Sequence, residues 1–129
     1  MPKELRRTPL YGSHLKLGAR LVDFAGWEMP IQYTGIIEEH QAVRSSAGIF
    51  DVSHMGRVDF TGHGACSFLQ RMITNDLARA EVCKGLYSFL CNEQGGIIDD
   101  IIAYHLAGNR YFVVVNGANR EKDLAWLKR

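Results

Sequence analysis

The 129-residue sequence has no long hydrophobic run, no internal repeat and no low-complexity stretch. No apolar segment approaches the ~20 residues that a helix needs to cross a bilayer, so we expect no membrane association. The first seven residues, Met-Pro-Lys-Glu-Leu-Arg-Arg, contain no apolar segment typical of a secretory signal. Only three cysteines occur, Cys66, Cys83 and Cys91, and none forms a Cys-x-x-Cys pair. This usage predicts reduced thiols and a cytoplasmic location.

Several ligand-binding patterns are also missing. The five histidines show no i, i+4 pair and share no spacing with cysteine, so we expect no metal site. Gly95-Gly96 precedes a strand pattern and does not join a strand to a helix, unlike a phosphate-binding loop. Basic residues do not alternate with aromatic ones in an extended patch, so no nucleic-acid partner is expected. Ser53 and His54, as neighbours on a strand, would point to opposite faces, which disfavours a nucleophile–base pair.

The net charge of +1 conceals an uneven distribution along the chain. Residues 1–20 carry five Lys or Arg and one acidic residue, whereas residues 21–119 carry six and eleven. A basic arm on an acidic body suits docking to an acidic surface by electrostatic complementarity. A solvated terminus explains the same charge pattern, so composition alone leaves both interpretations open.

Short helices and strands joined by turns make up the predicted secondary structure. Helical patterns cover residues 9–17, 36–47, 65–73 and 121–129. Strand patterns cover residues 20–24, 49–61, 86–91, 97–106 and 110–115. Residues 26–30 are expected to form a turn, Gly48 to end a helix in the left-handed conformation, and Asn119 to cap the last helix. The fold class is therefore α+β, a mainly antiparallel sheet with helices packed on one face.

Two adjacent aspartates interrupt the apolar strand predicted at residues 97–106. Successive strand side chains point to opposite faces, so Asp99 and Asp100 lie on different faces, each between two isoleucines. A buried ionised carboxylate is costly unless it is paired, hydrogen-bonded or shifted in pKa. The pattern therefore predicts a carboxylate tied up structurally or held ready for chemistry. The alternative is an edge strand whose aspartates are solvated or bonded to neighbouring backbone.

Five blocks occur in an order that resembles one protein family. They are Leu-Arg-Arg-Thr-Pro-Leu-Tyr at 5–11, Phe-Ala-Gly-Trp at 24–27 with Met29-Pro30 and Gln32-Tyr33, Glu39-His40 with Val43-Arg44, Phe-Asp-Val-Ser-His-Met at 50–55, and Gly-Gly-Ile-Ile-Asp-Asp at 95–100. Together they resemble the N-terminal portion of the aminomethyltransferases, the T-proteins of the glycine cleavage system. The basic arm and the Ser-His-Met block favour this family over folate-dependent demethylating enzymes and iron–sulfur assembly proteins that share the fold.

The resemblance implies a reaction and a set of site residues. The family transfers the methylene carbon of an aminomethyl group, carried on the lipoyl arm of the carrier H-protein, to the co-substrate tetrahydrofolate. Ammonia leaves and 5,10-methylenetetrahydrofolate forms. Asp100 matches the family's catalytic carboxylate, and Asp99 would be its structural neighbour on the opposite face. Further family positions match as folate contacts at Met55, Tyr87, Val114 and Asn116, and the basic arm, with Lys3, Arg6 and Arg7, would dock the carrier.

The resemblance also implies an incomplete fold. Residues 1–50 would be the N-terminal part of a first folate-binding domain, and residues 51–129 most of a second. Family members are much longer, and the pteridine-binding glutamate and the arginines for the folate tail would come from the remainder, in cis or on a second chain. We therefore expect the 129-residue chain to be nearly inactive by itself and to expose hydrophobic surface. A folate-binding or carrier-docking module without turnover and an inert folding remnant are the alternatives.

Overall fold

The computed structural model describes residues 4–129 and divides the chain into two compact units, Met1–His54 and Met55–Arg129. This division lies four residues after the boundary expected from the sequence. The assignment of the two units to two folate-binding domains stays a prediction. Each unit is an α+β arrangement with an antiparallel sheet, which confirms the predicted fold class.

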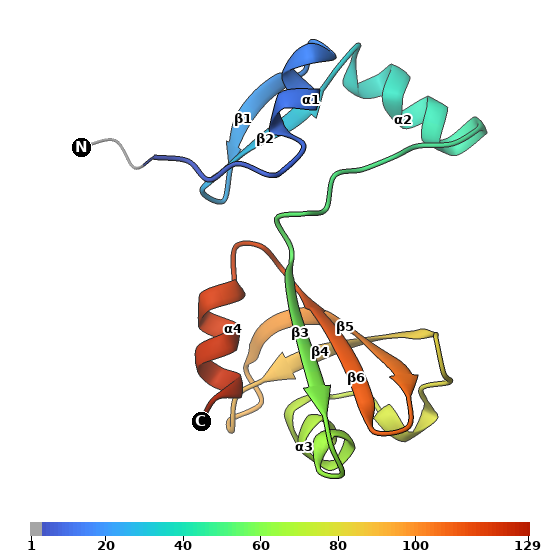
Figure 1. Ribbon diagram of the computed structural model, residues 1–129, viewed down its shortest axis with the longest axis vertical. Helices are drawn as coiled ribbons and strands as arrows, with labels where there is room; N and C mark the ends of the chain where they lie inside the picture. Colours follow the sequence, from blue (N-terminus) through green and yellow to red (C-terminus); the bar gives the residue numbers. More distant parts are fainter. Residues whose placement is uncertain (1–3) are drawn as a thin grey trace. The chain divides into compact units, whose positions relative to one another are not determined.

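The first unit contains one β-hairpin and two helices (Figure 1). Its elements are α1 (Tyr11–Lys16), β1 (Arg20–Phe24), β2 (Trp27–Gln32) and α2 (Ile36–Ser45). The segment before α1 lies along β2, because the N–H of Arg6 donates to the carbonyl of Gly26 and the N–H of Glu28 donates to that of Arg6. Within the described part of this unit, Trp27 and Met29 are the only buried apolar side chains. Little hydrophobic core therefore stabilises this unit.

The turn predicted at residues 26–30 is wrong, because the chain reverses earlier and then continues as β2. Ala25 and Gly26 both have positive φ, 51° and 81°, as a two-residue hairpin turn requires. The Asp23 carboxylate accepts the N–H of Gly26 and closes this turn. Pro30 is tolerated inside β2 because the bridge between Arg6 and Trp27, on the other side of β2 from β1, does not extend as far as Pro30.

Helix α2 ends two residues before the predicted end, and Gly48 does not adopt a left-handed conformation. The Ser45 hydroxyl donates to the carbonyl of Gln41, a local bond that competes with the helical pattern. No residue of α2 is buried in this chain. A hollow of about 630 Å³ lies beside it, and apolar side chains such as Ile36, Val43 and Phe50 contribute to its lining. The expected exposure of hydrophobic surface is thus observed in this unit.

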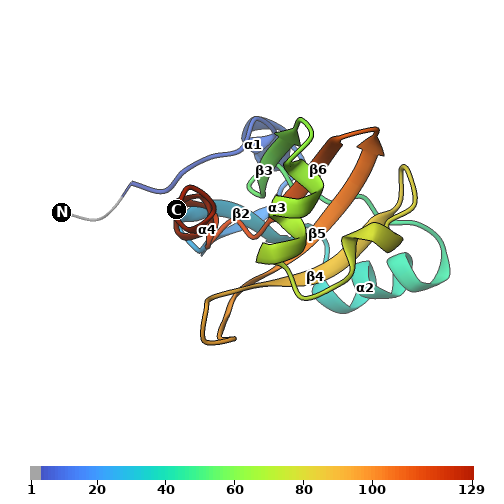
Figure 2. The ribbon, with the colours of Figure 1, turned by 90° about the horizontal axis from the view of Figure 1, so that it is seen from below.

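The second unit is a four-stranded antiparallel sheet with helices packed on one face (Figure 2). Its elements are β3 (Gly56–Thr61), α3 (Ala65–Met72), the short 3₁₀ helix η1 (Leu77–Arg79), β4 (Gly85–Cys91), β5 (Ile97–Ala107), β6 (Arg110–Val115) and α4 (Arg120–Leu127). The spatial order is β3-β6-β5-β4, so β5 and β6 are the central strands. The predicted β4–β5 hairpin and the third strand are confirmed.

One face of this sheet supplies the hydrophobic core. Leu69 of α3 and Leu77 of η1, each 1% exposed, pack against inward-facing residues of the strands such as Leu90, Ile101 and Val113. Trp126 and Leu127 of α4 pack against the same cluster. The alternation of strand residues leaves the other face, which we call the outer face, without a helix of this unit.

Two further expectations about this region need correction. Residues 49–55 contain no strand, so the predicted extended segment begins only at Gly56 with β3. Ser53 and His54 therefore lie in a turn, and the argument from opposite strand faces does not apply to them. Asn119 does occupy the N-cap position of α4, but its side chain makes no capping bond. It donates instead to the Asp99 carboxylate, as described below.

Candidate functional site

The two adjacent aspartates of β5 lie on opposite faces, as strand alternation predicts. Asp99 is 3% exposed and points to the helix-covered side, whereas Asp100 is exposed on the outer face. β5 is a central strand and not an edge, although Asp99 does bond a neighbouring backbone N–H, that of Asn116, as the alternative also allows. The same dipeptide thus supplies one buried and one accessible carboxylate.

The Asp100 carboxylate is held at both oxygens by side chains from neighbouring strands. The hydroxyl of Tyr87 on β4 donates to Oδ2 at 3.2 Å. The amide nitrogen of Asn116, which directly follows β6, donates to Oδ1 at 2.9 Å and to the Asp100 carbonyl at 3.0 Å. Desolvation and the hydrogen bond from its hydroxyl to Asp100 raise the pKa of Tyr87, so the phenol keeps its proton and acts as the donor. Three of the predicted site residues are therefore in direct contact.

The surface beside Asp100 is apolar and aromatic. Tyr87 pairs with Ile102 across β4 and β5, and Ile102 pairs with Val114 across β5 and β6. Tyr87 is 53% exposed, and its ring contacts Phe89 edge-on at 5.5 Å between centroids. Met55 stands one residue before β3 and is half-buried. A flat apolar surface with a carboxylate and an amide at its margin suits a planar heteroaromatic ring with a polar edge.

Asp99 is enclosed by donors from the segment that follows β6. The backbone N–H of Asn116 donates to Oδ2 at 2.9 Å, and the Asn116 side chain donates to Oδ1 at 3.1 Å. The amide of Asn119 also donates to Oδ1. Burial raises the pKa of Asp99, but these hydrogen bonds outweigh burial and hold it below its ordinary value. Asn116 therefore contacts both aspartates and links the buried carboxylate to the accessible one.

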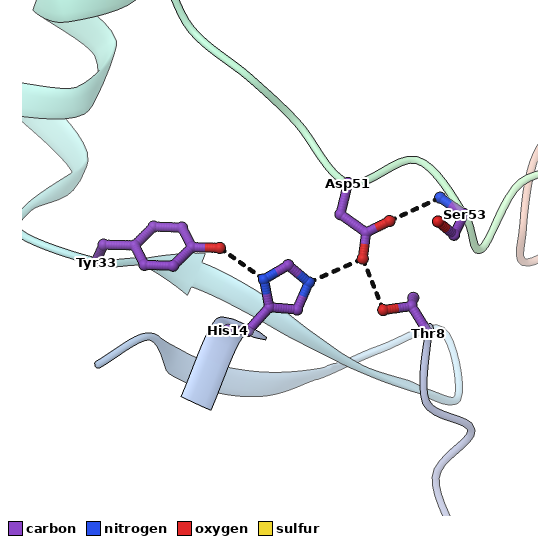
Figure 3. A network of polar contacts seen from close by, with 5 residues as sticks. All are labelled: Thr8, His14, Tyr33, Asp51 and Ser53. Carbon is purple, nitrogen blue, oxygen red and sulfur yellow. Dashed lines mark hydrogen bonds and ion pairs between the residues drawn. The ribbon is translucent and has the colours of Figure 1, made fainter. Parts of the chain in front are cut away.

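A second polar cluster lies within the first unit and was not found by sequence reasoning (Figure 3). Asp51 Oδ2 accepts from the Thr8 hydroxyl at 2.6 Å and from His14 Nε2 at 2.8 Å, while Oδ1 accepts the N–H of Ser53 at 2.9 Å. His14 Nδ1 contacts the Tyr33 hydroxyl at 2.7 Å. Burial opposes ionisation of Asp51, yet these donors hold its pKa well below the ordinary value. No spacing in the sequence predicts this cluster, because its members come from distant segments.

Part of the basic arm is bound to its own unit. The Arg6 guanidinium lies over the Trp27 ring at 5.0 Å, and the Arg7 guanidinium lies over the Tyr11 ring at 4.2 Å. Arg7 Nε also pairs with the Glu28 carboxylate at 2.9 Å, with both partners accessible to solvent. Lys3 lies outside the described residues. Arg6 and Arg7 are thus fixed on the surface of the unit, which leaves their carrier-docking role a prediction.

The described residues hold no group of three or more His, Cys, Asp or Glu side chains able to bind a metal ion. All three cysteines are free thiols. Over residues 4–129, no helix has both the length and the apolar character needed to cross a membrane.

Comparison of the sequence and of the fold with known proteins identifies the family of the chain. The sequence model of the family described as GCVT N-terminal domain matches residues 10–129, so the chain belongs to this family. It is 53% identical over 125 residues to the aminomethyltransferase of Desulforamulus reducens, covering 97% of this chain and 34% of that protein. It is 59% identical over 125 residues to the aminomethyltransferase of Rubrobacter xylanophilus, and the match covers 97% of this chain and 33% of that protein. These matches confirm the family resemblance seen in the sequence.

A solved structure shows the same architecture. The glycine cleavage system aminomethyltransferase T from Bartonella henselae superimposes with a TM-score of 0.91 at 41% sequence identity. The superposition covers 96% of this chain and 35% of that chain. The chain therefore spans about a third of the length of the relatives that it matches.

Proposed function

We propose that the outer face of the second unit is part of a tetrahydrofolate site of an aminomethyltransferase. In this reaction the methylene carbon of a lipoyl-bound aminomethyl group passes to tetrahydrofolate, and ammonia is released. The observation that carries the proposal is the Asp100 carboxylate, fixed by Tyr87 and Asn116 beside an exposed apolar surface. The names of the relatives support the reaction class.

Asp100 has three chemical roles open to it in such a transfer. Its carboxylate accepts a proton from a folate nitrogen as that nitrogen attacks the methylene carbon, stabilises the cationic iminium-like species, or orients the folate. Its two hydrogen bonds fix its orientation before the substrate arrives, which lowers the cost of reorganisation during the reaction. Tyr87 and Val114 would contact the face of the pteridine ring, and Met55 would add to the same surface. Asn116 would meet the polar edge of the ring.

The proposal extends to partners. The lipoyl carrier H-protein would deliver the aminomethyl group, with Arg6 and Arg7 at its docking surface. The remaining two-thirds of the family fold would complete the folate site, whether it lies in the same polypeptide or on a second one. Free thiols support a reducing compartment such as the cytoplasm. We expect no methylenetetrahydrofolate formation from residues 1–129 alone, and detectable turnover would refute that expectation.

The test is a calorimetric titration of tetrahydrofolate into the 129-residue chain and its Asp100→Asn variant. We expect saturable binding that the variant weakens about tenfold, since a charge-assisted hydrogen bond contributes about 1.5–3 kcal/mol. The matched control is Asp59→Asn, which changes another exposed aspartate of the outer face that pairs with Arg110. Equal affinities for all three proteins would contradict the role of Asp100.

A binding module without turnover is the second candidate function. This function would need only the Asp100 carboxylate and the exposed apolar surface beside it, both of which lie within the second unit. Adding the remaining part of the family fold as a second polypeptide distinguishes the enzyme from the binding module. Turnover that appears on mixing and is lost in Asp100→Asn supports the enzyme, whereas folate binding with no turnover on mixing supports the module.

A further inference from the structure

The carboxyl group of Asp123 in α4 is buried beside the candidate site and is not used by the proposed reaction. Asp123 is 0% exposed, and neither of its oxygens receives a hydrogen bond from a donor among the described residues. An ionised carboxylate in such a position would have no compensation for its lost hydration. A neutral carboxyl group avoids that cost, but its own O–H then needs an acceptor.

Asp99 is the acceptor that this proton can reach. The Asp99 and Asp123 side chains interact directly, and burial followed by this interaction raises the pKa of Asp123 to about 7. The same contact helps to lower the pKa of Asp99, so a proton held by this pair lies on Asp123 and not on Asp99. The charged groups that act on Asp123 are Asp99 from β5 and Lys122 from its own helix, and Lys122 favours ionisation.

The surrounding contacts link this pair to the outer face. Helix α4 is tied to the start of β5 by Lys122, whose ammonium donates to the carbonyl of Ile98 at 2.7 Å, and by Asn119, which donates to Asp99. Asp99 in turn accepts both the backbone N–H and the side-chain amide of Asn116. Asn116 is also the residue whose amide holds Asp100. A continuous set of hydrogen bonds therefore runs from the buried helix face to the exposed carboxylate.

We propose that Asp123 is a positioning residue of the Asp100 site, and that the proton it shares with Asp99 keeps the Asn116 amide on Asp100. Loss of that proton places two negative charges side by side in the core. Their repulsion displaces Asp99 or α4 and loosens the hold of Asn116 on Asp100. The relevance of this arrangement to folate chemistry rests on the proposed function, but the shared proton and its effect on Asn116 do not.

The experiment is an NMR titration of the 129-residue chain from pH 5 to pH 9. It follows the carboxyl carbons of Asp99 and Asp123 together with the side-chain amide signals of Asn116. We expect the Asp123 carboxyl to titrate near neutrality and the Asn116 amide to shift with the same midpoint. In Asp123→Asn, whose amide donates to Asp99 without titrating, the Asn116 shift should vanish. It should persist in the matched control Glu121→Gln, which removes an exposed acid from the same helix.

An Asp123 carboxyl that is ionised throughout, or an Asn116 amide that ignores its titration, would overturn the proposal. The wild-type titration decides this even if a variant fails to fold. Tetrahydrofolate binding adds a functional measurement. Between pH 6 and pH 8 the dissociation constant of the wild type should rise about fivefold or more compared with the change in Asp123→Asn, as for typical coupled sites. Absence of binding at every pH, with the NMR titration as expected, would contradict tetrahydrofolate binding by this chain alone and leave the shared proton established.

Discussion

Replacing Asp51 by alanine should unfold the first unit selectively. Its carboxylate accepts three hydrogen bonds, and its side chain is 2% exposed. The substitution leaves the Thr8 hydroxyl and the His14 ring N–H buried without an acceptor, at about 1–3 kcal/mol each. The N–H of Ser53 loses its acceptor as well, so the total cost is several kcal/mol. Whole domains are stable by only about 5–15 kcal/mol, and this unit buries few apolar side chains, so such a loss is a large fraction of its stability.

The assay is urea denaturation followed by tryptophan fluorescence. The chain has two tryptophans, the buried Trp27 in the first unit and Trp126 in the second. A Trp126→Phe background therefore makes the signal report on the first unit alone. We expect a large decrease in the urea midpoint for Asp51→Ala. Glu28→Gln, the control in the same unit, breaks the exposed ion pair with Arg7 and should leave the midpoint nearly unchanged.

Acid unfolding provides an independent check of the same reasoning. The pKa of Asp51 is lowered in the folded state, so its contribution to stability is present above the ordinary aspartate pKa of about 3.9. That contribution is lost as the pH falls from there toward the folded-state pKa. The stability of the first unit should therefore decrease below about pH 4, and Asp51→Asn should flatten that dependence. An equal midpoint shift in Asp51→Ala and Glu28→Gln, or an unchanged acid profile, would show that the cluster in Figure 3 does not stabilise the unit.

Three further predictions concern the second unit. Leu69→Ala should lower the free energy of unfolding by about 2–5 kcal/mol because Leu69 is 1% exposed in the core, as measured by urea denaturation with Trp126 fluorescence in a Trp27→Phe background. Asp99→Ala should destabilise this unit by several kcal/mol in the same assay, because it leaves the Asn116 N–H and the Asn119 amide unpaired. Asp100→Ala, on the exposed face, is the control and should have a small effect on stability. Tyr87→Phe removes only the hydroxyl that bonds Asp100, so it should weaken tetrahydrofolate binding about two- to tenfold without changing the unfolding midpoint; an affinity equal to that of the wild type would exclude this bond from the site.

The strands of the second unit could be predicted because their pattern is local. Runs rich in Val, Ile, Phe and Tyr mark β5 and β6, and the Gly-Gly turn marks the hairpin before β5. Alternation of faces alone separates Asp99 from Asp100. The register of β4, β5 and β6 then brings Tyr87 and Asn116 to the same carboxylate, a result that requires the structure.

The errors in prediction have physical causes of their own. Ala25 and Gly26 form a tighter turn than composition indicates, and Pro30 is tolerated because the backbone pairing with Arg6 ends before it. Asn119 has the residue type of a helix cap, but its NH₂ group donates to the buried Asp99 carboxylate and its side chain makes no capping bond. The contacts of Thr8, His14, Tyr33 and Asp51 are polar and long-range, and neither helical nor strand periodicity contains information about them.

The two aspartates of β5 differ in burial and hydrogen bonding because the helices cover only one face of the sheet. Asp99 faces α4 and must be satisfied by hydrogen bonds, and Asn116, Asn119 and the proton on Asp123 supply them. Asp100 faces the open side, where the Tyr87 hydroxyl and the Asn116 amide donate to its carboxylate. Because Asn116 serves both carboxylates, the packing that satisfies the buried one also orients the accessible one. The buried aspartate thus supports the candidate site from the opposite face, and substitutions at Asp99 should impair the proposed folate binding through Asn116.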